Sequence, residues 1–386
     1  MNVIPVIVSA KRTPIGKYGG MLKDIAPEQL AGEVIRAIIR ESNVIPDDID
    51  DVILGNAVGP GGNIARLSAL CAGLPVEVPG VTVDRQCGSG LEAINIAARL
   101  IQAGAGEIYL AGGVESTSRA PWKIERPKSL YGLESPKTFN RARFSPDHIG
   151  DPDMGIAAEN VAERYSVSRE AQDNYALLSH QKAVSSIRSN RFEDEIVPLT
   201  VNGQVINVDE CPRPDTDIKK LSSLRPVFRP NGTVTAGNSC PLNDGAAVVL
   251  LMSLDKATSL GLTPLLIYED SVAVGVDPNY LGIGPVPAIS KLLQRNRIEI
   301  DDIDLVEFNE AFAAQVLASL SELSITTDKV NVGGGTIALG HPYGASGAIL
   351  VTRLCTEMHR LGCSKGLATL GIGGGLGLAT LFRNNL

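Results

Sequence analysis

One short stretch of the sequence occurs twice, as DDIDDV at residues 47–52 and as DDIDLV at residues 301–306, an offset of 254 residues. In both copies an amphipathic helix pattern precedes the stretch, and an apolar strand pattern begins within it. An internal repeat of this kind indicates a duplicated supersecondary unit. We therefore expect two halves of similar fold, packed about a pseudo-twofold axis.

The same offset relates a cysteine to a histidine, because Cys87 in the first copy corresponds to His341 in the second (341 − 87 = 254). Each residue lies in a glycine-bearing turn, CGSG at 87–90 and HPYG at 341–344, just before an apolar helix pattern. The exposed N–H groups and the dipole of a helix N-terminus favour a thiolate, and a nearby imidazole can accept the thiol proton. We predict that Cys87 and His341 form an activated nucleophile pair.

The first 116 residues alternate between strand and helix patterns. Strand patterns cover residues 3–9, 51–55, 80–84 and 108–111, and a helix pattern covers 28–42. After the CGSG turn, apolar residues recur at helical spacing from Leu91 to Ile101. This alternation predicts βαβ units with a parallel sheet that is covered on both faces.

The middle of the chain has a different composition. Residues 122–153 are rich in Pro, Lys, Arg and Ser without a sustained period, and helix patterns follow at 155–164 and 169–189. We interpret residues 117–245 as an inserted loop domain. The N-terminal half then covers residues 1–116, with residues 246–262 returning to it, and the C-terminal half covers residues 263–386.

Composition and charge narrow the class of protein. A chain of 386 residues is long enough for two or three packed units. The net charge of −8 disfavours non-specific binding to nucleic acid or to an anionic membrane. Six cysteines without CxxC spacing suggest neither a disulfide framework nor a zinc site, so we expect reduced thiols and a cytoplasmic protein. We expect no signal peptide and no transmembrane helix.

Four motifs make this chain resemble the thiolase family: DRQCGSG at 84–90, NEAFA at 309–313, GGTIALGHPYGASG at 334–347 and GGG at 373–375. Weaker matches fill the intervals, so the resemblance extends over essentially the whole chain in the family's order. It implies an α/β fold of duplicated βαβ halves about a pseudo-twofold axis, layered α/β/α/β/α, with an inserted loop domain. It also implies an acyltransferase that forms or cleaves acetoacetyl-CoA or another 3-ketoacyl-CoA.

The resemblance further implies a role for each residue of the predicted site. Cys87 would attack the carbonyl of an acyl-CoA or 3-ketoacyl-CoA and hold the acyl group as a thioester. His341 would activate Cys87 and later help to hold the thioester oxygen, together with a water oriented by Asn309. The N–H groups of Cys87 and Gly373 would form a second oxyanion site, while Glu310 would support loop structure.

Coenzyme A is expected as a substrate, and neither a cofactor nor a metal is expected. Because the protein is acidic, the phosphates of CoA need local cations, which the inserted domain offers. The expected partners are acyl-CoA and CoA, without nucleic acid or membrane, in a homodimer or homotetramer. The candidate substrate-binding residues are Met154, Arg213, Lys219, Lys220, Arg225, Ser239 and Cys240.

The sequence departs from the family at one position with chemical consequences. Thiolases usually carry a second cysteine directly before the terminal Ile-Gly-Gly-Gly, where it acts as acid and base on the α-carbon of the substrate. In this chain that position is Gly371. Since glycine cannot transfer a proton, we expect acyl exchange to be retained and the carbon–carbon step to be slow, by up to about 10²–10⁴-fold.

Two alternatives remain open on the sequence alone. A β-ketoacyl synthase-like condensing enzyme would share the duplicated architecture and the cysteine, although Asn309 precedes His341 here, which favours a thiolase. A catalytically reduced, acyl-CoA-binding thiolase-like protein is the second alternative, suggested by Gly371.

Overall fold

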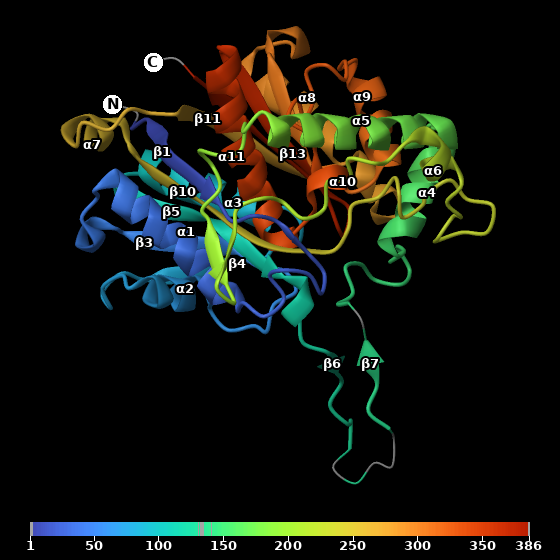
Figure 1. Cartoon of the computed structure of the whole chain (residues 1–386), viewed down its shortest axis with the longest axis horizontal. Coiled ribbons are helices and arrows are strands. Elements are labelled where there is room, and N and C mark those ends of the chain that lie inside the picture. Colours follow the sequence, from blue (N-terminus) through green and yellow to red (C-terminus); the bar gives the residue numbers. More distant parts are fainter. Residues whose placement is uncertain (1–2, 130, 132–134, 140, 385–386) are drawn as a thin grey trace.

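The computed structural model in Figure 1 describes residues 3–129, 131, 135–139 and 141–384. Residues 1–2 and 385–386, at the outer ends of the two predicted halves, lie outside the described residues. The strands of the main sheet are β1 (Pro5–Arg12), β2 (Gly16–Lys17), β3 (Asp51–Gly55), β4 (Gly80–Val83), β5 (Ile108–Ser116), β10 (Asn243–Ser253), β11 (Leu266–Gly275), β12 (Leu305–Phe308), β13 (Lys365–Ile372) and β14 (Leu376–Arg383). The helices are α1 (Pro27–Ser42), α2 (Ile64–Ala72), α3 (Ser89–Gln102), α4 (Met154–Arg164), α5 (Arg169–Arg188), α6 (Ile218–Ser222), α7 (Leu254–Ser259), α8 (Pro285–Asn296), α9 (Ala313–Leu323), α10 (Thr336–Leu339) and α11 (Tyr343–Leu361).

The order of the strands shows the duplication directly. The sheet runs β12-β13-β14-β11-β1-β10-β5-β3-β4. Outward from its centre, β1-β10-β5-β3 in one half corresponds to β11-β14-β13-β12 in the other. The halves join where β1 pairs with β11, through Val6 with Ile267 and Ile7 with Leu266.

The expectation of a parallel sheet is wrong for much of this structure. Strands β3–β4, β3–β5 and β12–β13 are parallel, but β10 runs antiparallel to both β1 and β5, and β14 runs antiparallel to both β11 and β13. The connection from β13 to β14 is only residues 373–375. So short a connection cannot make a crossover, and it therefore forces antiparallel neighbours.

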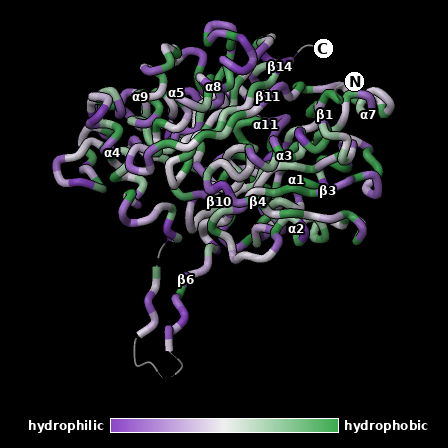
Figure 2. Tube along the Cα trace, turned by 180° about the vertical axis from the view of Figure 1, so that it is seen from behind, coloured by the Kyte–Doolittle hydropathy of each residue, from purple (hydrophilic) through white to green (hydrophobic). Residues whose placement is uncertain are grey.

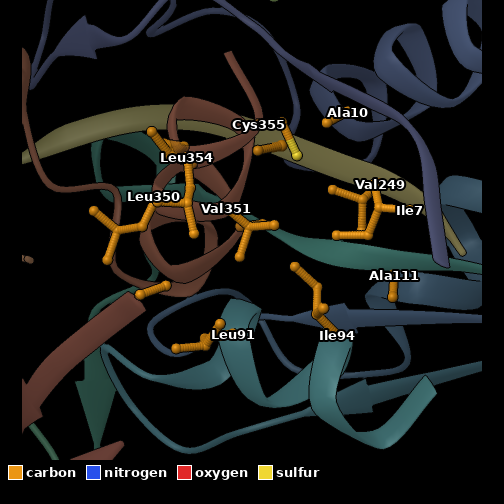
Figure 3. Packing of buried hydrophobic residues seen from close by; sticks show 14 of the residues in the cluster. Ile7, Ala10, Leu91, Ile94, Ala111, Val249, Leu350, Val351, Leu354 and Cys355 are labelled. Atoms are coloured by element: carbon orange, nitrogen blue, oxygen red, sulfur yellow. The ribbon is translucent and has the colours of Figure 1, made fainter. Parts of the chain in front are cut away.

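Helices and the two half-sheets form five layers. Helices α3 and α11 lie in the middle, where Leu91 and Ile94 of α3 pack with Leu350, Val351 and Leu354 of α11 (Figure 3). This cluster also takes in inward-facing residues of both half-sheets. Helices α1 and α2 cover the outer face of one half-sheet, and α8 and α9 cover the outer face of the other. The predicted α/β/α/β/α layering is confirmed.

The middle of the chain lies at the periphery. Helices α4 and α5 begin and end within one or two residues of their predicted bounds. Before them, the antiparallel pair β6 (Lys123–Ile124) and β7 (Thr138–Phe139) forms an arm that projects from the body (Figure 1).

Apolar residues concentrate along the central strands and polar residues along the peripheral loops (Figure 2). The predicted boundaries of the loop domain, 117 and 245, stay a prediction. Within the described part of the chain, no helix combines the length and the apolar character needed to cross a bilayer.

A buried ionic network connects the middle of the chain to both halves. Glu195 accepts hydrogen bonds from Arg12 at 2.8 Å and from Arg353 at 2.6 Å, and all three side chains are almost fully buried. Burial acts to raise the pKa of Glu195, but Arg353 and Arg12 hold it below its usual value. By contrast, burial raises the pKa of nearby Glu307 from 4.5 to about 8. Its Oε1 atom has no hydrogen-bond partner among the described residues.

The raised pKa of Glu307 predicts that the free energy of unfolding falls as pH rises. Between pH 4.5 and about 8 the folded state keeps a proton that the unfolded state releases, so this group lowers stability as pH rises. We expect Glu307→Gln to remove that slope and to raise the free energy of unfolding above pH 8 by roughly 2 to 4 kcal/mol. Urea denaturation of both proteins at pH 5 and pH 8.5 checks it.

Glu195→Gln is the matched control for Glu307→Gln. It removes a charge that is paired with Arg12 and Arg353, so it should destabilise the fold at pH 8.5 by about 3–5 kcal/mol. Equal stability differences for Glu307→Gln at both pH values would contradict the assignment of a buried, protonated carboxyl.

Candidate functional site

The site lies where the N-termini of α3 and α11 touch. α3 begins at Ser89 and α11 at Tyr343, so their starts differ by the repeat offset (343 − 89 = 254). A Cβ added to Gly90 would lie 2.7 Å from the carbonyl oxygen of Gly344, and one added to Gly347 would lie 2.3 Å from the backbone nitrogen of Leu91. Only glycine permits this backbone contact. It brings the turns that precede both helices together.

A strained turn presents Cys87. Gln86 has φ of +47°, an unusual conformation for a residue other than glycine. Ser89 holds the turn, because its Oγ donates to the Gln86 carbonyl at 2.6 Å and accepts from the Arg85 N–H at 2.8 Å. Such strain is common where a side chain must be aimed at a reaction centre. Cys87 is half-buried at the tip of this turn.

The resting thiol of Cys87 is protonated. Burial raises its pKa to about 11, although the N–H groups of Gly373 and of Cys87 itself act to lower it. The helix N-terminus was expected to favour the thiolate, but desolvation outweighs that effect before substrate binds. A base is therefore needed to take the thiol proton.

His341 is buried and neutral. Burial lowers its pKa to about 3. Its Nδ1 lies 2.5 Å from Oγ of Ser346, and that hydroxyl donates its own proton to the Pro342 carbonyl at 3.0 Å. The Ser346 oxygen can therefore only accept from the imidazole, which places the ring proton on Nδ1. Nε2 is therefore unprotonated, and its lone pair can accept a proton.

Asn309 faces that lone pair. Its Nδ2 lies 3.3 Å from Nε2 of His341, and its backbone N–H donates to the Thr369 carbonyl at 3.0 Å. Its Oδ1 is buried and has no partner among the described residues. An unpaired buried acceptor indicates a place for a water or a ligand group. The neighbouring Glu310 accepts from Tyr175 and Ser179, and thus supports the loop.

Gly373 completes the set of backbone donors. It begins the turn from β13 to β14, in which Gly374 and Gly375 have φ of +87° and +80°. A Cβ added to Gly373 would lie 3.0 Å from the Phe144 ring. The segment after the projecting arm therefore covers the backbone whose N–H points to Cys87.

Position 371 has a normal strand conformation but no free space. Gly371 pairs with Gly377 in the β13–β14 ladder and is absent from the residues with positive φ. A Cβ added there would lie 2.6 Å from Nε2 of Gln315 and 3.2 Å from the Gly282 carbonyl oxygen. Gln315 is 1% exposed, and its Nε2 has no partner among the described residues. The amide of Gln315 thus fills the space where the family's second cysteine would begin.

The segment that contains Ser239 and Cys240 runs beside the catalytic loops. Ser239 pairs with Phe312, the Cys240 N–H donates to the Ala311 carbonyl at 3.0 Å, and Leu242 pairs with His341. The hydroxyl of Ser239 is occupied by the Thr235 carbonyl at 2.7 Å.

Other predicted substrate contacts lie around this segment. Met154 opens α4 next to Gly155, whose added Cβ would overlap the Phe228 ring. Phe228 in turn packs edge to face on Phe312 at 6.1 Å. Arg213 and Ser239 line one cavity of about 320 Å³.

The remaining predicted cations lie outside that cavity lining. Lys219 and Lys220 are exposed on the short helix α6, and Lys220 pairs with Asp215 at 3.1 Å. Arg225 is exposed beyond that helix.

Sequence reasoning missed several residues that position the site. Ser346 sets the tautomer of His341, and Asn243 accepts from the His341 N–H at 2.8 Å. Glu115, fully buried, accepts from the N–H of Gly344 in the first turn of α11. Ser346 belongs to the motif at residues 334–347, so the sequence offered its hydroxyl as a candidate partner for His341. Gln315 on α9 and Gly371 on β13 are far apart in the sequence, so no local sequence pattern predicts their contact.

The role of Ser346 is testable through the reactivity of Cys87. Ser346→Ala removes the acceptor for Nδ1–H, so the ring proton can move to Nε2 and block proton uptake. We expect alkylation of Cys87 by iodoacetamide at pH 7 to slow about 10-fold or more. Thr352→Val is the matched control, because Thr352 on the same helix also bonds a carbonyl four residues earlier but does not touch His341. Equal rates in the parent and Ser346→Ala would refute the tautomer assignment.

Comparison with known proteins matches both parts of the chain to the same family. Residues 5–255 match the thiolase N-terminal domain, and residues 262–384 match the thiolase C-terminal domain. Proteins of Staphylococcus haemolyticus and Staphylococcus epidermidis that carry the name acetyl-CoA C-acetyltransferase VraB are each 51% identical to this chain, over 98% of its length and 98% of their own.

Solved structures agree with these sequence matches. A Bacillus anthracis acetyl-CoA acetyltransferase superposes with a TM-score of 0.94 at 42% identity over 100% of both chains. Human mitochondrial 3-ketoacyl-CoA thiolase, solved in complex with CoA, has a TM-score of 0.94 at 38% identity over 99% of this chain and 98% of its own. Two thiolase domains matched in order, with 51% identity over 98% of the chain, mean that this protein belongs to the thiolase family of acyltransferases.

Proposed function

We propose that this protein transfers acyl groups between Cys87 and coenzyme A, and thereby forms or cleaves acetoacetyl-CoA or another 3-ketoacyl-CoA. One observation carries the proposal: a protonated thiol, held by the Gly373 N–H, shares the site with a neutral imidazole whose Nε2 is unprotonated and accepts from Asn309 Nδ2 at 3.3 Å. Nucleophile and base thus coexist in their resting protonation states.

The first step needs only groups at this site. His341 takes the thiol proton on Nε2, and the sulfur of Cys87 attacks the carbonyl carbon of the bound thioester. The backbone N–H groups of Cys87 and Gly373 would stabilise the oxyanion at the acyl-enzyme, and removal of such a donor typically costs about 10²–10³-fold. His341, once protonated on Nε2, would donate to the second oxygen, together with a water that the unpaired Oδ1 of Asn309 orients.

The names of similar proteins support the choice of substrate class. The Staphylococcus proteins are named for acetyl transfer to acetyl-CoA, whereas the human structure is a 3-ketoacyl-CoA thiolase with CoA bound. The cavity lined by Arg213 and Ser239, beside the Cys240 segment, offers a place for part of the CoA chain. Lys219, Lys220, Arg225 and Met154 remain proposed contacts. A homodimer or homotetramer remains the proposed assembly. All six cysteines are free, which supports the cytoplasm as compartment.

Carbon–carbon chemistry requires one more group. When the bond between C2 and C3 of a 3-ketoacyl-CoA breaks, C2 must take up a proton, and Gly371 offers none. A binding protein with reduced catalysis stays the second candidate function for that reason alone. Acyl exchange distinguishes the two functions, since a silenced protein would form no thioester on Cys87.

Acylation of Cys87 is the direct test. Incubation with acetyl-CoA should add one acetyl group to the intact protein, and brief treatment with neutral hydroxylamine should remove it, because the bond is a thioester. Cys87→Ala should show no adduct, while Cys71→Ser, which removes a half-buried thiol from helix α2, should keep it. An acetyl group that persists in Cys87→Ala would disprove the assignment of the nucleophile.

A further inference from the structure

A second thiol, Cys240, lies on a segment next to the loop of Asn309 and the turn of His341. The segment of residues 239–242 runs between the loop that carries Asn309 and the turn that carries His341. Cys240 is fixed there by its N–H bond to the Ala311 carbonyl at 3.0 Å. Its backbone therefore lies beside both the loop of Asn309 and the turn of His341.

The electrostatics agree with this placement. Burial raises the pKa of Cys240 well above its usual value, and the charge of a Cys87 thiolate raises it further. Cys240 is consequently a neutral thiol at rest, close enough to Cys87 for their charges to interact. The unpaired buried Oδ1 of Asn309, in the loop next to this segment, indicates independently a place for a ligand group or a water.

We propose that Cys240 supplies and recovers the proton that moves at the α-carbon of the substrate, in place of a thiol at position 371. This inference rests on the proposed function, because it assigns a further catalytic group to the same site. The sequence predicted a slow carbon–carbon step because of Gly371. With Cys240 in this role, the carbon–carbon step proceeds through a thiol on a different segment of the chain.

The protons balance in the thiolysis direction. The thiolate of Cys87 attacks C3 of a 3-ketoacyl-CoA, the C2–C3 bond breaks, and its electron pair takes the proton of the Cys240 thiol at C2. Acetyl-CoA leaves. The thiol of the incoming CoA then gives its proton to the Cys240 thiolate, its sulfur attacks the acyl carbon, and the electron pair of the broken C–S bond returns to Cys87. The Cys87 proton, held on His341 meanwhile, returns to the thiolate.

Two other groups near Cys87 fit this role less well. Gln315 fills the space at position 371, but an amide has no proton to exchange at neutral pH. Tyr343 lies edge to face on the His341 ring at 5.0 Å, and its hydroxyl also interacts electrostatically with Cys240 and Cys87. A phenol is intrinsically a weaker acid than a thiol by about 1.5 pKa units, and its rigid ring is held by the histidine.

The experiment separates proton transfer from acyl transfer. Three rates are measured for the parent, Cys240→Ala and Cys240→Ser: exchange of the acetyl group between acetyl-CoA and labelled CoA, thiolysis of acetoacetyl-CoA, and deuterium uptake at the methyl group of acetyl-CoA in D₂O. In Cys240→Ala we expect thiolysis and deuterium uptake to fall about 10²-fold or more, and the ratio of thiolysis to acetyl exchange to fall at least 10-fold, because His341 alone can carry the proton that moves in exchange. Cys240→Ser should resemble Cys240→Ala.

A rescue variant and a control variant keep the test decisive. Gly371→Cys combined with Gln315→Ala, which clears the space for the new side chain, should restore thiolysis at least 10-fold in the Cys240→Ala background. Tyr343→Phe should keep the ratio of thiolysis to exchange. Thiolysis that survives in Cys240→Ala, is lost only in Tyr343→Phe, or is absent from a parent that exchanges acetyl groups would overturn the inference and leave acylation of Cys87 intact. Absence of both exchange and the Cys87 adduct would instead refute the proposed function.

Discussion

Backbone contact between two helix starts is the constraint on which the site depends. Gly90 on α3 and Gly347 on α11 let the two helices approach until main chain meets main chain. A methyl group at either position would overlap backbone atoms, which cannot move aside without displacing a whole helix. The two turns before these helices therefore have a fixed separation, and this contact sets the positions of Cys87 and His341, the proposed nucleophile and base.

Burial then sets the resting charge of the reacting pair. Desolvation disfavours a thiolate and an imidazolium alike, so Cys87 and His341 are both neutral before substrate binds. Proton transfer between them would create a charged pair in a buried site. The backbone N–H groups near Cys87 stabilise the anionic partner without the cost of reorganising solvent.

The internal repeat predicted how the two halves correspond. The direction of strands β10 and β14 could not be predicted from the sequence. The offset of 254 predicted the alignment of Cys87 with His341, and the starts of α3 and α11 reproduce that number. The antiparallel strands β10 and β14 were not foreseen, because a fully buried strand reads the same in either direction. The proposed CoA contacts, such as Arg213 and Lys219, are single cationic residues outside the long helices and strands, so no periodic pattern in the sequence predicts them. The packing of Gln315 against position 371 is a contact between helix and strand that only the folded chain brings together.

The central helix α11 has a consequence for how the chain must be made. It belongs to the C-terminal half, yet its apolar side packs on α3 and on inward-facing residues of the N-terminal half-sheet, such as Ile7 and Ala111. It begins only at residue 343 of 386. During synthesis the first half therefore leaves the ribosome with the inner face of its sheet covered only in part, by α3, until residues 343–361 have been translated. The two domains that are recognisable in the sequence are not two folding units, since each must wait for the other to close its core.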